Sequence, residues 1–542
     1  MARYSLGSRI VRVGTLVCIL LLCGAPLHHV AAQVPPDPAA IEQAIVNGLA
    51  WLATQQQGDG GWGPIGSCDR IARTGLAVVK LETRARELGK DPLAPDYQYS
   101  VNVQAGLNYL MALQIQMPIG VQPAGNPDGD GDGWGIYFRD PACPVHDTYN
   151  TSIGLMALAA SGHPELYGAT GQDVVDLIAW GQADSNCGQH RGGWRYMLTN
   201  DCDSDNSNSG WVTVALGYAQ ASPPHGLGLT VPQFVKDELS IWLDVMQDDV
   251  NGDADDGGSW YAPGWPWVNV LKTGSLIYEL GLVGDSKTSQ RVRDAVDYLE
   301  RHWKDMNPDP GWGFGRPSAH YQAMFAIMKG LEALGIDKLD LDGDGTAEWD
   351  WYAEYAQAIV GQQLADGSWP WDYWADNQIA TVWALLTLEK SVPKLEIEVP
   401  FDVKPGSCPN PIETESRGVL AVAVLGTADF DVTTIDPASV SLVNPSLPPN
   451  IAALPLRWSY EDVATPYEPY VGKTGIRDCN ALGLDGYLDL TIKFDTQSVV
   501  PVLGTVVDGQ AVVLQIRGKL KEEFGGTSFV GEDVVRVLLK GK

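Results

Sequence analysis

A tryptophan recurs six times behind a run of glycine and aspartate in the first two-thirds of this 542-residue chain. The six residues are Trp62, Trp134, Trp194, Trp260, Trp312 and Trp369. They lie roughly 50 to 70 residues apart, a period typical of architectures in which one structural unit is stacked on the next. Because the same residue occurs in every unit, we expect these tryptophans to pack each unit against its neighbour rather than to bind a ligand.

Two helical segments flank each tryptophan. The segment before it is amphipathic, as where Ile41, Ile45, Leu49 and Leu52 recur at helical spacing. The segment after it is apolar on most sides, which is typical of a buried helix. The expected outer helices are 40–56, 101–116, 173–183, 235–247, 291–303 and 352–365, and the inner ones 72–89, 150–163, 209–222, 270–284, 320–335 and 378–390. This pattern predicts an (α/α)6 toroid over residues 33–390, with an open solenoid of helix pairs as the alternative.

The N-terminus is expected to be a signal peptide, residues 1–32. Three arginines precede a short apolar run at 16–22, and small residues follow up to Ala32. The apolar run is too short to span a bilayer as a stable helix. We therefore expect a secreted, periplasmic or cell-surface protein with no membrane span.

The helical pattern ends near Lys390. Residues 391–404 are rich in proline and predict a linker. Residues 405–542 contain short alternating segments, at 418–426, 438–443, 487–494, 510–518 and 532–539, separated by glycine, proline and aspartate turns. They predict a C-terminal antiparallel β-sandwich.

The net charge limits the partners that this chain can bind. The net charge is −31, so the chain would repel a phosphate backbone and nucleic acid is not an expected partner.

Six cysteines follow residue 32, an even number that indicates disulfides in an exported chain. Proximity favours Cys187–Cys202, and the domain division favours Cys408–Cys479. The remaining pair is Cys68–Cys143.

The repeat resembles that of terpenoid cyclases and protein prenyltransferases, in which glutamine precedes a glycine-rich turn and tryptophan. The best matches are residues 55–62 (QQQGDGGW) and 362–369 (QQLADGSW). The resemblance implies an α/α toroid. It also directs attention to Asp253-Ala254-Asp255-Asp256, which matches the acid motif of class II cyclases. That motif opens an inner helix in those enzymes, whereas here it precedes a repeat turn, so a solvated or calcium-binding loop is the alternative.

The C-terminal segment is similar to a β module that recurs at the ends of exported bacterial proteins. Residues 401–412, 418–442, 485–494 and 531–537 carry the resemblance. It implies presentation, adhesion or anchoring, and the resemblance attaches no activity to the module.

Alternating acidic residues indicate metal-binding loops. The strongest match to a calcium loop has acids at its first, third, fifth and ninth positions, and a second loop has the same start. The expected calcium ligands are Asp340, Asp342, Asp344 and Glu348 in the first loop, and Asp128, Asp130 and Asp132 in the second. A polar turn without metal is the alternative for both.

Residues at the start of the inner helices should surround a central cavity. Asp147 and Asp376 are candidates for an acid/base pair, with helix N-caps as the alternative, and His320 with Tyr321 is the candidate proton-transfer pair. The expected ligand-binding aromatic residues, which do not belong to the repeat, are Tyr261, Trp265, Trp267, Trp371, Tyr373 and Trp374.

These observations favour an exported toroid that serves as a binding or surface scaffold with calcium-stabilised loops. A glycan or an apolar small molecule would be its ligand. A polysaccharide lyase or hydrolase that uses the cavity is the first alternative, and a terpenoid cyclase or isoprenoid-binding enzyme is the second.

Overall fold

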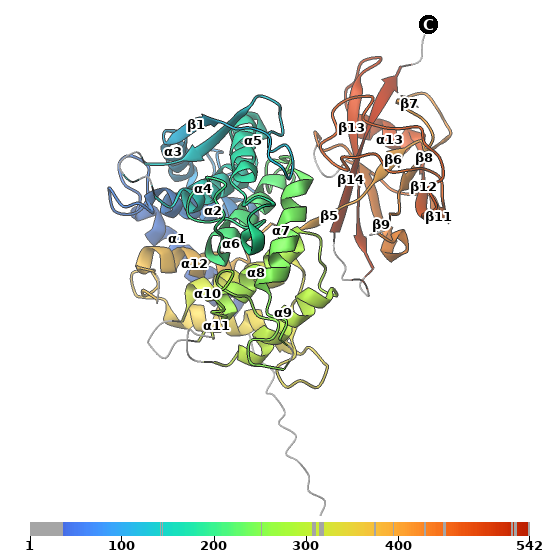
Figure 1. Cartoon of the computed structure of the whole chain (residues 1–542). Helices are drawn as coiled ribbons and strands as arrows, with labels where there is room; N and C mark the ends of the chain where they lie inside the picture. The colour runs from blue at the N-terminus through green and yellow to red at the C-terminus, as the bar shows by residue number, and fades with distance from the viewer. Residues whose placement is uncertain are drawn as a thin grey trace, which may run out of the picture.

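The structure is a computed structural model with a helical part and a β part (Figure 1). It describes residues 36–140, 143, 145–250, 252–305, 311–313, 319–372, 375–393, 395–427, 430–447, 451–521, 524 and 528–539. The expected signal peptide lies outside the described residues. Among the helices that the structure describes, none is both long and apolar enough to cross a membrane.

The helical part contains the twelve expected helices. The more exposed set is α1 (Pro38–Thr54), α3 (Ser100–Met111), α5 (Pro164–Trp180), α7 (Gln233–Met246), α9 (Gln290–His302) and α11 (Trp351–Gln362). The more buried set is α2 (Arg70–Glu87), α4 (Asp147–Ala160), α6 (Asn206–Gln220), α8 (Val270–Leu282), α10 (Tyr321–Ala333) and α12 (Asn377–Leu388).

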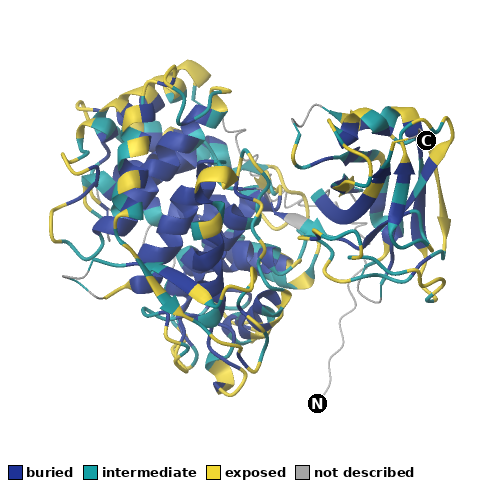
Figure 2. Cartoon of the chain, turned by 90° about the horizontal axis from the view of Figure 1, so that it is seen from above, coloured by how far each residue is buried: buried dark blue, intermediate teal, exposed yellow. Residues whose placement is uncertain are grey.

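The buried helices contact one another in cyclic order. α2 contacts α4, and the succession continues through α6, α8, α10 and α12 until α12 contacts α2. Almost every residue of α4 is buried, whereas α1 buries a single stripe that includes Ile45, Leu49 and Leu52. Figure 2 shows this difference as dark blue central helices beside helices with yellow outer faces.

Four glutamines each join one outer helix to the next by a pair of hydrogen bonds, which we call a joint. Gln363 follows α11, and its side-chain amide donates to the carbonyl oxygens of Gly367 in its own turn (2.9 Å) and of Ala44 in α1 (2.8 Å). The same pair of bonds runs from Gln56 to its turn and α3, from Gln182 to its turn and α7, and from Gln247 to its turn and α9. The joint at Gln363 therefore connects the last outer helix to the first.

Most of the repeat tryptophans are structural residues. Trp62, Trp194 and Trp369 are at most 1% exposed, and each donates its indole N–H to a carbonyl oxygen of the preceding outer helix. Trp62 also lies against Gly106 of α3 and Trp369 against Gly48 of α1, so the expectation that these residues pack one unit on the next is confirmed for these two. Trp134 differs most at 41% exposed, because a β-hairpin replaces the tight turn in its unit, and Trp260 is half-buried.

Two hairpins interrupt the helical pattern. β1 (Gln114–Pro118) pairs with β2 (Trp134–Phe138), and β3 (Lys338–Leu339) pairs with β4 (Trp349–Asp350), in both cases antiparallel. The prediction of helix through residue 116 was wrong at its end, because 114–116 pair with β2 instead. Each hairpin carries one of the two expected calcium loops between its strands.

The β part consists of two sheets around a shared core that includes Val422, Ile492 and Leu514. Its elements are β5 (Glu396–Glu398), β6 (Phe401–Val403), β7 (Asn410–Glu413), β8 (Val419–Val424), β9 (Ile435–Val443), β10 (Ala452–Ala453), β11 (Arg457–Glu461), β12 (Asp489–Asp495), α13 (Thr496–Leu503), β13 (Ala511–Leu520) and β14 (Ser528–Leu538).

The order of strands corrects two expectations. One sheet runs β10-β9-β13-β14-β5 with β7 also on β14, and the other runs β11-β12-β8-β6. β5 and β7 pair with β14 in parallel, so the first sheet is mixed rather than antiparallel, since crossovers rather than hairpins connect these strands. β5 and β6 also lie within residues 391–404, which are therefore part of the sheets and not a plain linker.

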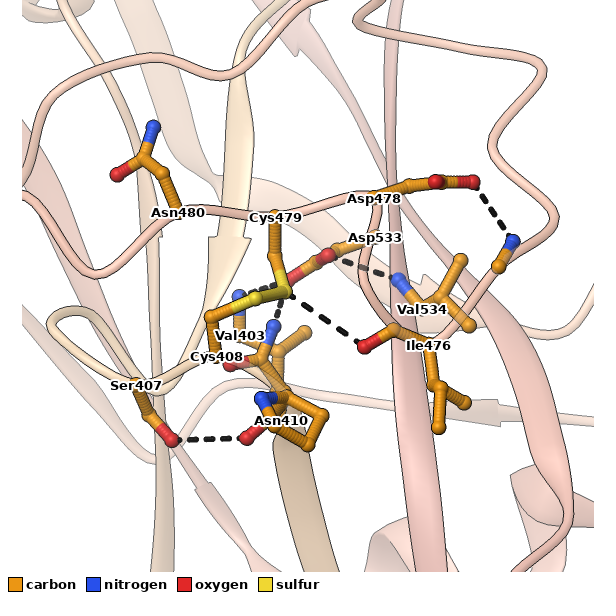
Figure 3. Close-up of a disulfide and its surroundings, with 12 residues drawn as sticks. Val403, Ser407, Cys408, Asn410, Ile476, Asp478, Cys479, Asn480, Asp533 and Val534 are labelled. Carbon is orange, nitrogen blue, oxygen red and sulfur yellow. Dashed lines mark hydrogen bonds between the residues drawn. A yellow bond between two sulfur atoms is a disulfide. The ribbon is translucent and has the colours of Figure 1, made fainter.

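The structure forms the three expected disulfides, Cys68–Cys143, Cys187–Cys202 and Cys408–Cys479. Cys408–Cys479 has a Cα–Cα distance of 5.7 Å and lies beside the buried Asn410, whose amide donates to Asp533 (2.7 Å; Figure 3). The two parts of the chain are also in polar contact. Lys236 of α7 lies 2.6 Å from Glu398 of β5.

Candidate functional site

A cavity of about 570 Å³ lies where the buried helices begin. Every one of these helices contributes to its wall. Representative residues are Arg73 of α2, Tyr149 of α4, Trp211 of α6, Lys272 of α8, Gln322 of α10 and Trp383 of α12. Because the N-terminal ends of all six helices meet there, the cavity lies on the axis of their cyclic arrangement.

Aromatic rings form one continuous side of the wall. His146 lies 5.5 Å from Tyr196, and Tyr196 lies 6.0 Å from Tyr149, measured between ring centroids. The hydroxyls of Tyr196 and Tyr261 are 3.2 Å apart. The row continues from Tyr261 to two tryptophans of the same loop, Trp265 (5.2 Å) and Trp267 (5.7 Å). A ligand in the cavity would meet ring faces and edges on this side.

The polar atoms of this wall bond mainly to other protein groups. Tyr149 donates to Ser207 (2.8 Å), and Ser207 donates to the buried carboxylate of Asp205 (2.5 Å). Asn150 is held by the backbone of Ala72 and Cys68. Burial, together with the nearby Asp205 carboxylate, raises the pKa of Tyr149 and Tyr261 well above the usual range of a phenol. Both tyrosines are therefore neutral at physiological pH.

The charged residues of the wall are similarly engaged. Arg73 bonds to Asp69 (2.7 Å) and to Asp376 (2.7 Å). Burial raises the pKa of Asp69, but bonds from Ser67 and Arg73 outweigh it and leave the pKa lowered. The ammonium group of Lys272 lies 3.4 Å from the ring centroid of Trp267, a close cation–π contact.

The structure places the expected catalytic residues in the surrounding framework. None of Asp147, His320, Tyr321 and Asp376 lies among the described residues of the cavity wall. Asp147 is ion-paired with Arg139. Asp376 caps α12, as the alternative expectation held. The Tyr321 hydroxyl donates to Gln362 (2.6 Å), and His320, 2% exposed, lies 3.7 Å from Asp372.

The cyclase-like acid motif lies away from the cavity. Asp253 accepts hydrogen bonds from the backbone of Asp255 (2.9 Å) and Asp256 (3.0 Å), which makes the segment a self-bonded turn between α7 and α8. Burial raises the pKa of Asp255, and the like charge of Asp253 adds to that rise. No residue of the motif lines the cavity in the described part of the chain.

Of the expected ligand-binding aromatic residues, Tyr261, Trp265 and Trp267 line the cavity. Trp371 is 52% exposed and is not part of the wall, and Tyr373 and Trp374 lie outside the described residues. The sequence did not single out Tyr149, Tyr196, Trp211 and Trp383. Three of these lie on apolar helices, where the sequence does not distinguish an aromatic residue that lines a cavity from one that packs in the core. Tyr196, in the loop after Trp194, could have been found as an aromatic residue outside the repeat.

Carboxylates gather at both hairpin loops. Asp340, Asp342, Asp344 and Glu348 offer oxygen atoms that lie within 4.8 Å of one another. In the other loop, Asp128 and Asp130 meet Asp176 of α5, and Asp130 and Asp132 meet Asp173. Burial and then the loop carboxylates raise the pKa of Asp173 to about 6. The α5 aspartates were not expected as ligands, because the sequence gives no sign of which helix a loop folds against.

The backbone of the two loops is organised identically. Asp340 accepts from the backbone N–H of Gly343 and Gly345, as Asp128 does from Gly131 and Gly133. This arrangement turns the carboxylates toward the inside of each loop. Carboxylate and carbonyl oxygens are the ligands that calcium prefers, so the donor set fits a hard divalent cation.

No protein-family model matches this chain, and no curated protein sequence matches it. Among solved structures, it is similar to a fragment of native alpha-2-macroglobulin from Escherichia coli, at 12% identity over 94% of this chain and 76% of that chain. It is also similar to a GH127 beta-arabinofuranosidase, at 12% identity over 92% of this chain and 89% of that chain. The TM-score is 0.32 in both cases, which does not establish a common fold. Neither likeness assigns a function to this chain.

Proposed function

We propose that this chain is an exported binding protein that holds an apolar small ligand in the axial cavity of an (α/α)6 toroid. In this proposal, residues 1–32 are a signal peptide, 33–390 form the toroid, and the remainder is a β-sandwich module. The cyclic contacts of the buried helices and the joint from Gln363 to Ala44 support a closed toroid over an open solenoid.

The observation that carries the binding function is the aromatic wall of the cavity. Protein sites for small ligands are typically concave and mostly apolar, with a few polar groups that fix orientation. The wall of this cavity is mostly apolar with a few polar groups, and the cavity volume of about 570 Å³ is within the usual range of such sites. The single carboxylate among its described residues, Asp69, is bonded to Arg73. Glycoside hydrolysis typically uses two carboxylates that face the substrate, so the wall favours binding over that chemistry.

Filling the cavity should abolish ligand binding. Ala72 lies in the wall on the buried side of α2. An apolar fluorescent dye, 8-anilinonaphthalene-1-sulfonate, should bind the native chain and lose at least tenfold in affinity to Ala72→Trp. The control is Ile65→Trp, which adds an indole at a residue that is 79% exposed. Titrations followed by dye fluorescence check the effect. Equal affinity for both variants would place the dye elsewhere and contradict the proposal.

A glycan is the second candidate ligand. Trp265 lines the cavity and is also 58% exposed, so an indole face is available at the mouth for stacking on a sugar ring. An array of glycans would separate the two candidates. Specific retention of a glycan by the native chain, lost in Trp265→Ala, would favour the glycan over the apolar ligand.

We further propose that the two hairpin loops bind calcium and thereby stabilise the helical part. A ligand that binds only the folded state adds about 2.7 kcal/mol at a hundredfold excess over its Kd. Removing calcium with EDTA should therefore lower the Tm, and adding calcium should restore it, as measured by circular dichroism. The variant Asp342→Asn/Glu348→Gln keeps the acceptor oxygen that bonds to Asp344 but should respond less to calcium. An identical Tm with EDTA and with calcium would refute the proposal.

A further inference from the structure

β11 (Arg457–Glu461) is an edge strand with an unusual exposed face. It pairs with β12 on one side, and no described strand pairs with its other side. All five of its residues are exposed, including Trp458 (46%) and Tyr460 (37%). Figure 1 shows β11 on the side of the β part that is remote from the helices, so the helical part does not cover it. Exposed edges of this kind are ready to pair with another strand, and proteins usually protect them with charge, proline or a bulge.

The sequence of β11 is complementary to itself when two copies run antiparallel. With Ser459 opposite Ser459 of a second copy, Arg457 faces Glu461 and Trp458 faces Tyr460 in both halves of the pair. Opposite charges and aromatic pairs directly across two antiparallel strands are stabilising. We propose that β11 is a dimerisation strand, which pairs with β11 of a second copy of this chain about a twofold axis at Ser459.

The register is defined by the side chains. Trp458 pairs with Ile492 of β12 and Tyr460 with Leu490, so both aromatic residues lie on the face of the sheet that carries the core. If the two strands were shifted by one residue, Trp458 would lie opposite Ser459 of the second copy, and the core face of one sheet would continue into the outer face of the other. A slip by two residues restores the face but separates Arg457 from Glu461. The register centred on Ser459 alone satisfies both pairs.

A second copy is a better occupant than a strand of another protein, because the complement of this strand is the strand itself. The net charge of −31 makes two copies repel each other at long range. Local attraction therefore has to provide the association, and β11 concentrates both exposed aromatic area and opposite charges. Leu454 (69% exposed) and Leu456 (58% exposed) extend the apolar surface before the strand. The paired strands would join two four-stranded sheets into one continuous sheet, a closed twofold arrangement that leaves this edge covered.

Charge reversal tests the register. Sedimentation equilibrium of the native chain should show a monomer–dimer equilibrium. Arg457→Glu places two acidic pairs across the axis and Glu461→Arg places two basic pairs, so each should weaken dimerisation at least tenfold. The double variant Arg457→Glu/Glu461→Arg restores opposite charges and should recover most of the affinity. Unchanged Tm values would show that the variants fold.

A cysteine crosslink tests the same register independently. Residues directly opposite in an antiparallel pair have Cβ atoms about 5 Å apart. Ser459→Cys should therefore form a disulfide-linked dimer under mild oxidation, whereas Ala438→Cys, exposed on β9 of the other sheet, should not. A native chain that stays monomeric up to its solubility limit would overturn the proposal. A dimer that is insensitive to charge reversal and is not crosslinked through residue 459 would overturn it as well.

Discussion

Gly192→Ala should destabilise the helical part by about 4 kcal/mol, the sum expected from backbone strain and from overpacking a close contact. Gly192 has a φ of 90°, a conformation that residues with a side chain rarely adopt. A Cβ there would also overlap the carbonyl oxygen of Glu238 in α7. The same Gly192 carbonyl accepts the bond from Gln182, so a shift of the turn to relieve the overlap would break that joint.

A matched glycine separates the two causes. Gly66 has a similar φ of 83° but nothing within 4 Å of its Cβ position. Gly66→Ala should therefore lose only the cost of strain, about 1 kcal/mol. Urea unfolding of the native chain and both variants measures the difference. An equal loss of unfolding free energy in both variants would mean that the close approach of the Gly192 turn to α7 adds nothing to the cost of the substitution. The turn would then tolerate a side chain as well as a turn with no close neighbour does.

The second large effect is a pH dependence centred on Glu82. This α2 residue is fully buried, and neither of its carboxylate oxygens has a hydrogen-bond partner among the described residues. Burial raises its pKa well above the usual 4.5, and the charge of Arg86 offsets this only in part. As the pH rises above 4.5, the unfolded chain releases this proton while the folded chain keeps it. Stability is therefore complete below the unfolded pKa and is lost as the pH rises toward the folded pKa.

Glu82→Gln should remove this loss. Each pH unit between the two pKa values is worth about 1.4 kcal/mol, so the variant should gain on the native chain at that rate as the pH rises from the unfolded pKa toward the folded one. Urea unfolding at a series of pH values measures the gain, with Glu87→Gln, an exposed acid on the same helix, as the control. Other buried acids, such as Glu279, titrate in both proteins and cancel in the comparison. Parallel pH profiles for the native chain and Glu82→Gln would rule out a protonated Glu82.

The sequence predicted the framework better than the site, for physical reasons. All twelve helices of the helical part were expected because apolar periodicity is a local property of the chain, and the disulfides followed from spacing and the division into parts. β11 was missed because Arg457, Ser459 and Glu461 alternate with exposed aromatic residues, so that no buried stripe marks a strand. Asp147 was expected to catalyse or cap, whereas Arg139 from β2's end pairs with it, a contact that only the hairpin creates.

The cavity shows the same limit. Loop aromatic residues such as Tyr261 stood out because they lie outside the repeat. Trp211 and Trp383 did not, because their helices are apolar throughout and the side that faces the axis has no distinct composition. The orientation of each helix about its own axis depends on its two neighbours, and that information is not present in any one segment.

The connection between the first and last units has a consequence for how the chain acquires its structure. Gln363 bonds to Ala44 across 319 residues, and Arg73 reaches Asp376 across 303. Contacts between such distant segments require a large loss of loop entropy before they form, and folding rates fall as such contacts dominate. Until α12 is in place, these contacts cannot form, and the apolar faces that the first and last units bury against each other stay exposed. A chaperone that covers these faces would therefore act before α12 packs against α1 and α2.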